Sequence, residues 1–264
     1  MINKLKLELQ KIINQLNIKT IIVVPDLMHA IPIIGKSKIE TLNMHIDILN
    51  NLFHCPIWIP TFSYSTVENH YYDINTTKSE IGILNEYFRI HKATWRSPHP
   101  IYNFAGTGCM PNIILNDIIY PYDKTSMFHQ MNKAGYYLLS YGSRFGTQSR
   151  YLLNYIETLA NVPYRKDVIV EISIKNKDHI AQHKACYRIM PQGEKPFNGE
   201  HYRNDIYNEL VDNAIAYPIN NNYSYLDIID IHLMVDYFYN KLISQPFYLL
   251  NPEYTKWLIN NNLI

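Results

Sequence analysis

The 264 residues are enough for one sizeable hydrophobic core, and an apolar share of 47% with 18% charged residues is ordinary for a globular protein. The 24 basic and 23 acidic residues leave a net charge of +1 without a long basic run, which argues against nucleic-acid binding as the main role. Three widely spaced cysteines argue against a disulfide framework and against a zinc site of paired cysteines.

The chain begins with an amphipathic pattern. Apolar residues over 2–17 have helical spacing, and charges interrupt them, so neither a signal peptide nor a membrane span is expected and we place the protein in the cytoplasm. A β-branched run at 20–24 predicts a buried strand. Residues 37–53 predict a helix, and residues 56–60 predict a second strand.

This strand–helix–strand spacing indicates a parallel unit. Ligands of such sheets bind beyond the carboxyl ends of the strands. Asp26 and Thr61 each follow one of these ends, so we expect a site there.

The later part of the chain predicts more helices and strands. Helices are expected at 78–91, 124–134, about 149–159 and 226–244, and strands at 135–141, 167–174 and 183–190. We expect an α/β fold with a central mixed sheet flanked by helices. Residues 1–264 should form a single domain, in which a subdomain could occupy about 160–200.

The stretch from Thr61 to Gly108 is the most informative. Polar, donor-rich residues there alternate with prolines and glycines, which fix irregular backbone in the loops where sites tend to lie. The stretch resembles the aminoglycoside 3-N-acetyltransferase family, also called the antibiotic N-acetyltransferase family. The residues that carry the resemblance are Thr61, Phe62, Ser63, Tyr64, Gly82, Glu86, Arg89, Arg96, Ser97, His99, Pro100, Ala105 and Gly108. The resemblance implies transfer of an acetyl group from acetyl-CoA to a sugar amine, on the family's α/β fold rather than the GNAT fold.

Two further segments resemble the family's coenzyme-binding elements. Asp26 and Leu27 match the first, although Val24-Pro25 stands where the family has His-Ser. Ser126 matches the second, although Asp123 replaces a glycine. The resemblance implies that Asp26, Leu27 and Ser126 contact coenzyme A.

A fourth match resembles the family's His-x-x-Glu helix and its Val-Pro-Tyr-Arg exit, but Asn154 holds the position of the catalytic histidine. Asparagine cannot take a proton at neutral pH, and losing a general base costs roughly 100- to 10,000-fold in rate. Three interpretations stay open. Glu157, His99 or Asp26 takes the proton instead; or the amine arrives neutral and water carries the proton away; or the protein only binds.

The resemblance further implies substrate contacts from loop residues, namely Ser63, Tyr64, Asp73, Glu86, Arg96 and Ser97. Each has a structural alternative: Arg89 and Arg96 could pair with Glu86 or Asp73, Ser63 and Tyr64 could pack, Glu157 could pair with Arg165, and His99 could hold a turn. His179 and His183 could in principle share a metal, but their polar surroundings indicate a solvated loop, and we expect no metal.

We therefore expect N-acyl transfer from acetyl-CoA, or a related acyl-CoA, to an amino sugar. Because the chain is not acidic, a small or nucleotide-linked amino sugar is favoured over a polycation. The alternatives are a catalytically silent family member that binds a sugar or a partner, an aminoglycoside-modifying resistance enzyme, and an enzyme that takes its acyl group from a carrier protein.

Overall fold

A seven-stranded sheet forms the centre of the computed structural model, which describes residues 2–113, 115–142, 150–191, 193, 197–219 and 226–264. The strand order is β10-β11-β7-β1-β2-β5-β4. These strands are β1 (Thr20–Pro25), β2 (Ile57–Pro60), β4 (Trp95–Arg96), β5 (Phe104–Gly106), β7 (Tyr136–Tyr141), β10 (Ala216–Pro218) and β11 (Leu226–Asp230). The three strands β7, β1 and β2 run parallel, and the outer strands run antiparallel to their neighbours, so the central sheet is mixed as expected.

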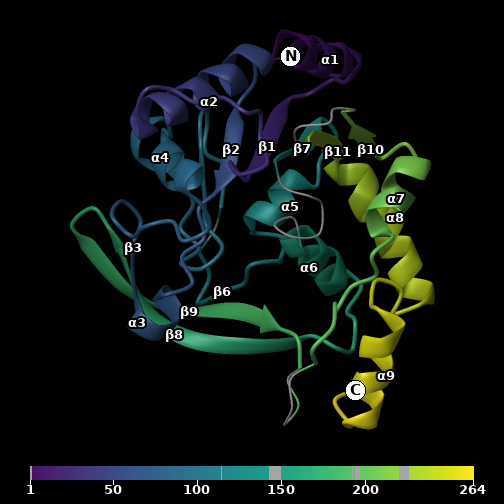
Figure 1. Ribbon diagram of the computed structural model, residues 1–264. Coiled ribbons are helices and arrows are strands. Elements are labelled where there is room, and N and C mark those ends of the chain that lie inside the picture. Colours follow the sequence, from purple (N-terminus) through teal and green to yellow (C-terminus); the bar gives the residue numbers. More distant parts are fainter. Residues whose placement is uncertain (1, 114, 143–149, 192, 194–196, 220–225) are drawn as a thin grey trace.

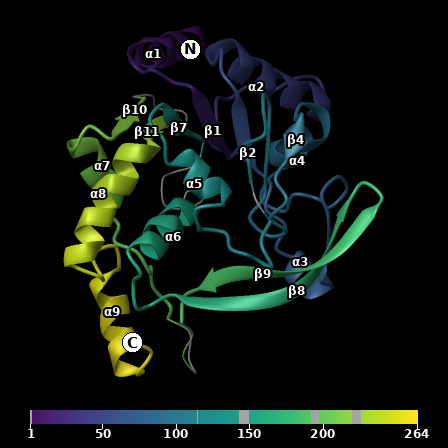
Figure 2. The same ribbon diagram turned by 180° about the vertical axis from the view of Figure 1, so that it is seen from behind.

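Helices cover both faces of this sheet (Figure 1 and, from behind, Figure 2). The described helices are α1 (Ile2–Gln15), α2 (Lys38–Leu52), α3 (Thr66–Asn69), α4 (Ile83–His91), α5 (Met127–Met131), α6 (Arg150–Leu159), α7 (Ile206–Asp212), α8 (Ile231–Ser244) and α9 (Pro252–Asn260). None of them is long and apolar enough to cross a bilayer.

Successive residues of β1 point to opposite faces, as strand geometry requires. Ile21 and Val23 pack with the core under α2 and α4, whereas Ile22 and Val24 pack with the core under α6 and α8. A strand buried on both faces needs a continuous apolar run, which explains why 20–24 stood out in the sequence.

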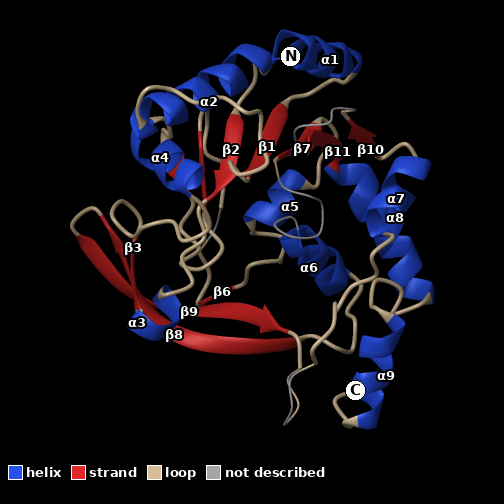
Figure 3. Ribbon diagram, viewed as in Figure 1, coloured by secondary structure: helices blue, strands red, loops and turns tan. Residues whose placement is uncertain are grey.

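A second sheet lies apart from the first, below it in Figure 3. Its order is β3-β8-β9-β6, from β3 (Tyr71–Asp73), β6 (Ile118–Ile119), β8 (Lys166–Asn176) and β9 (His179–Ile189). The long antiparallel hairpin β8–β9 occupies most of the 160–200 segment, where a subdomain was one possibility.

Four expected elements differ from those observed. Leu226–Asp230 is strand β11 rather than the start of a helix, and α8 begins only at Ile231, where the side chain of Asp230 accepts from Leu233 N. His179 and His183 lie in strand β9 instead of a loop. The helices expected at 78–91 and 124–134 are shorter: α4 begins after Gly82 and α5 after the capping side chain of Ser126.

Candidate active site

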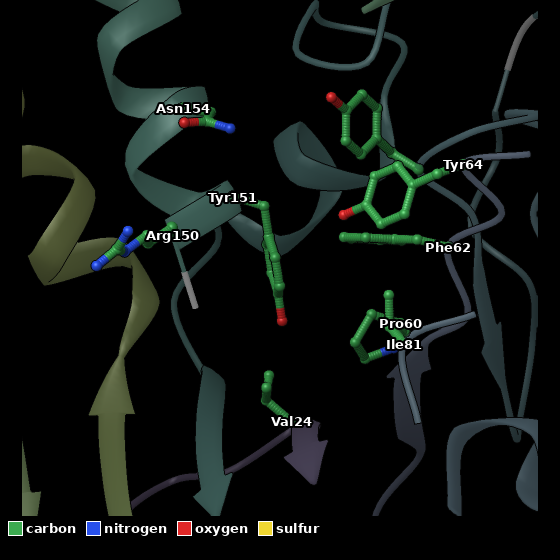
Figure 4. A pocket seen from close by; sticks show the side chains of 9 residues that line it. Val24, Pro60, Phe62, Tyr64, Ile81, Arg150, Tyr151 and Asn154 are labelled. Atoms are coloured by element: carbon green, nitrogen blue, oxygen red, sulfur yellow. The ribbon is translucent and has the colours of Figure 1, made fainter. Parts of the chain in front are cut away.

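A cavity of about 320 Å³ lies between the tips of β1 and β2 and the first turns of α6 (Figure 4). It is thus at the carboxyl ends of neighbouring parallel strands, where ligands of open α/β sheets bind. The lining residues are Val24, Pro60, Phe62, Tyr64, Ile81, Tyr102, Arg150, Tyr151 and Asn154.

The extended backbone after β2 explains one wall of the cavity. Thr61 N and Ser63 N donate to the carbonyls of Asn103 (2.8 Å) and Ile101 (3.0 Å), which keeps this segment strand-like. Side chains in such a segment alternate between two sides. Pro60, Phe62 and Tyr64 therefore face the cavity, whereas Thr61 and Ser63 face away from it.

Arg96 lies on that far side and holds the loops together. Its guanidinium donates to Asn103 Oδ1 (2.9 Å), the carbonyls of Ile74 (3.2 Å), Thr77 and Thr61 (3.1 Å), and Ser63 Oγ (3.0 Å). Burial lowers the pKa of Arg96. Because a guanidinium has five N–H donors and five acceptors surround it, Arg96 and Ser63 have structural contacts here and do not line the cavity.

Ser97 and His99 are also turned inward. Ser97 Oγ accepts from Phe104 N (2.8 Å), and His99 Nδ1 accepts from Ile101 N (3.1 Å) and Tyr102 N (3.0 Å). Burial lowers the pKa of His99 to about 3, so the imidazole is neutral and holds its turn. Its position outside the cavity, with Nδ1 occupied, does not support His99 as the proton acceptor.

Asp73 and Glu86 lie outside the cavity as well. Asp73 accepts from Asn75 N (2.8 Å) and pairs with Lys175 Nζ (3.3 Å). Glu86 is bonded to Arg89 through both carboxylate oxygens at 2.8 Å. Partial burial would raise the pKa of Glu86, but hydrogen bonds from Arg89 and Ser79 N, together with the charges of Arg89 and Arg96, lower it. Glu86 therefore makes the arginine pair that was its structural alternative, whereas Asp73 pairs with Lys175 rather than with Arg89 or Arg96.

The three expected coenzyme residues do not line the cavity either. Asp26, just beyond the tip of β1, accepts from Met28 N (3.1 Å), and Leu27 packs against the core under α2. Ser126 caps α5 by accepting from His129 N (3.2 Å). Residues 143–149, which follow Gly142, lie outside the described residues.

Glu157 is fully buried one turn after Asn154, behind the cavity. One carboxylate oxygen accepts from Tyr164 Oη (2.9 Å), and the other accepts from Arg165 Nε (2.7 Å) and Tyr202 Oη (3.2 Å). Burial alone would lower the pKa of Arg165, but the Glu157 carboxylate raises it. Arg165 therefore stays charged, and both oxygens of Glu157 already have partners.

The same arginine fixes the orientation of the Asn154 amide. Asn154 Oδ1 accepts from Arg165 Nη2 and lies 3.2 Å from Tyr202 Oη, whose single proton it shares with Glu157, whereas Nδ2 donates to Tyr122 Oη (3.3 Å). Since a guanidinium only donates, the amide atom beside it must be the oxygen. The polar atom that Asn154 offers on its other side is thus an N–H donor.

Sequence reasoning missed Arg150, Tyr151 and Tyr102 as lining residues. A usable signal existed for Tyr151, because it lies three residues before Asn154 and so shares its helix face. Arg150 donates to Glu200 (2.7 Å) and lies over the ring of Tyr202.

The fold is that of an open mixed α/β protein with a cavity at the carboxyl ends of its parallel strands. The profile of the aminoglycoside 3-N-acetyltransferase family matches residues 57–204, more than half of the chain. The chain belongs to this family.

Solved structures agree with this assignment. The apoenzyme of aminoglycoside acetyltransferase AAC(3)-IVa superposes with a TM-score of 0.67 at 18% identity, covering 94% of this chain and 91% of that chain. AAC-IIIb in binary complex with CoASH gives 0.67 at 15% identity (91% and 96% covered), and AAC-VIa bound to sisomicin gives 0.69 at 16% (91% and 97%). At these identities the likeness establishes the fold alone. No curated protein matches the sequence.

Proposed function

We propose that the protein transfers an acyl group from acyl-CoA to the amine of a small or nucleotide-linked amino sugar. The observation that carries this proposal is the cavity wall: the described lining residues include Arg150 and no Asp or Glu. A polycationic amine bound in the cavity would meet no carboxylate there. A neutral sugar amine avoids the cost of placing a cation where no carboxylate can pair with it. An amino sugar linked to an anionic nucleotide avoids the same cost.

The proposed chemistry needs no protein base inside the cavity. The amine enters neutral, and its nitrogen attacks the thioester carbon. The C–N bond forms, the C–S bond breaks, and the departing thiolate takes up the proton that the nitrogen loses. Amide and free thiol are the products, and the chain contributes alignment, which by itself can supply several kcal/mol.

Within this proposal the residues have different roles. Asn154 donates through Nδ2 to an oxygen of the acceptor, and Tyr64, about half exposed at the cavity, packs against the sugar ring. Asp26 and Leu27 are partly exposed just beyond Val24 and contact the coenzyme outside the cavity. Ser126 is buried at its cap and receives no binding role.

The rival with a specific observation behind it is a silent binding protein. Both oxygens of Glu157 and the oxygen of Asn154 already have donors, so neither offers a free proton acceptor. Such a protein would bind a sugar without turning it over.

Thiol release from acetyl-CoA distinguishes these functions. We expect turnover with a nucleotide-linked amino sugar or with free glucosamine, and a lower kcat/KM with a polycationic aminoglycoside. The variant Asn154→Asp places a carboxylate oxygen where Nδ2 was and should shift the preference towards the polycation. Binding of an amino sugar in calorimetry with no thiol release from any amine would favour the silent rival. A preference of the wild-type protein for the aminoglycoside would contradict the proposed substrate class.

A further inference from the structure

The Tyr151 hydroxyl is a buried polar group without a partner among the described residues. The side chain begins on the first turn of α6 and lines the cavity, and the residue is only 8% exposed. Its ring packs edge-on against Phe62, with centroids 5.1 Å apart, and lies 5.6 Å from the ring of Phe128. A phenylalanine would make these contacts equally well, so packing does not explain the hydroxyl.

An unsatisfied buried hydroxyl costs stability, and such groups in folded proteins call for an explanation. Figure 4 shows the Tyr151 hydroxyl pointing towards Val24 at the tip of β1, away from Asn154. Burial raises the pKa of Tyr151, so the group keeps its proton and is a hydrogen-bond donor. Among the described residues this O–H has no acceptor, and an acceptor atom of a bound ligand would satisfy it.

The surroundings of this hydroxyl limit what that ligand group can be. Val24, Pro60 and Ile81 line the same cavity and offer apolar side chains. A sugar ring carries several hydroxyls and would need several polar partners. A short acyl group has one apolar methyl and one carbonyl oxygen, which matches one apolar wall with one donor.

We propose that Tyr151 is a catalytic residue that donates a hydrogen bond to the thioester carbonyl oxygen, in an acyl pocket formed with Val24, Pro60 and Ile81. This inference rests on the proposed function. When the amine nitrogen bonds to the thioester carbon, the carbonyl π pair moves onto the oxygen and gives it negative charge. The Tyr151 O–H stabilises that charge without losing its proton. The pair then re-forms the C=O bond, the C–S bond breaks, and the thiolate takes the proton from nitrogen.

The variant Tyr151→Phe removes only the hydroxyl. Loss of one donor to such an oxygen typically lowers kcat about 100- to 1,000-fold. We expect that loss with little change in the KM for acetyl-CoA, and a melting temperature that is unchanged or higher. The matched control is Tyr155→Phe on the same helix, whose hydroxyl contacts His129 Nδ1 (3.2 Å) outside the cavity lining. It should keep the wild-type kcat.

Calorimetry with two analogues tests the contact without turnover. S-acetonyl-CoA carries a ketone, whereas S-propyl-CoA has the same length and no carbonyl. The wild-type protein should bind the ketone roughly 3- to 10-fold more tightly, and Tyr151→Phe should bind both equally. If wild type and variant show the same preference, Tyr151 does not contact the carbonyl, and the proposed function survives. If the wild-type protein binds neither analogue, acyl-CoA is not its donor and both proposals are wrong.

Discussion

Replacing Glu157 by glutamine separates a structural carboxylate from a catalytic one. The variant Glu157→Gln keeps the size of the side chain and removes its charge. Arg165 would then be a buried cation without its counter-ion, because its side chain is only 5% exposed and Glu157 is its ion-pair partner. Breaking a buried pair from one side costs about 3–5 kcal/mol.

This cost is large for a domain of this size. About 2–4 °C of melting temperature are lost per kcal/mol in chains of 150–250 residues, so we expect a drop of roughly 6–20 °C. Differential scanning calorimetry measures it directly. The matched control is Glu200→Gln, which breaks an exposed ion pair with Arg150 and should cost no more than about 1 kcal/mol.

The double variant Glu157→Gln/Arg165→Met removes both charges and should recover part of the stability, because no buried charge is left alone. The pH–rate profile gives the opposing test. If Glu157→Gln has the same melting temperature as the wild-type protein but loses an acidic limb of its pH–rate profile, Glu157 is the proton acceptor and the structural explanation is wrong.

Two further predictions concern the imidazoles. Asn154→His introduces a group that titrates near pH 6.5. We therefore expect up to roughly 100-fold faster thiol release and a new acidic limb in the pH–rate profile. An unchanged profile would show that no base is needed at this position. His99 has a pKa of about 3 in the folded protein and an ordinary value in the unfolded chain, so the unfolded state binds the extra proton and stability falls as pH drops from about 6.5 towards 3. The side chain of His99→Asn can accept the same backbone N–H groups. Urea unfolding should show that this variant removes about 2 kcal/mol of the difference in unfolding free energy between pH 7 and pH 5. An equal pH dependence of the unfolding free energy in both proteins would contradict a neutral buried imidazole.

Much of the fold could be predicted because local patterns and tertiary structure agree. The β1–α2–β2 unit follows from a β-branched run, a helical period and a second short strand, and its parallel register places the cavity. Strand β11 could not be found in this way. It is buried on both faces, so it lacks a period of two, and its apolar run merges with the helical pattern of α8.

The candidate site was harder to predict for a different reason. Ser63, Arg96 and Ser97 belong to a motif, and a motif marks residues that a family shares whether they touch a substrate or hold a loop. Only the three-dimensional contacts separate the two cases. Arg96 has five acceptors around it and therefore shapes the cavity from behind, whereas Tyr151 belongs to no motif and its side chain lines the cavity.

The Glu157–Arg165 pair behind the cavity determines that Asn154 presents a hydrogen-bond donor. The Glu157–Arg165 pair connects α6 to the segment that leaves it, and the same guanidinium donates to the amide oxygen of Asn154. As long as that pair is intact, Asn154 can offer only its N–H on the other side. A proton acceptor at this position therefore requires a change of residue, because rotating the amide would place two donors together. The wall beside α6 thus provides donors from Asn154 and Tyr151, and under the proposed function the amine would bring its own lone pair uncharged.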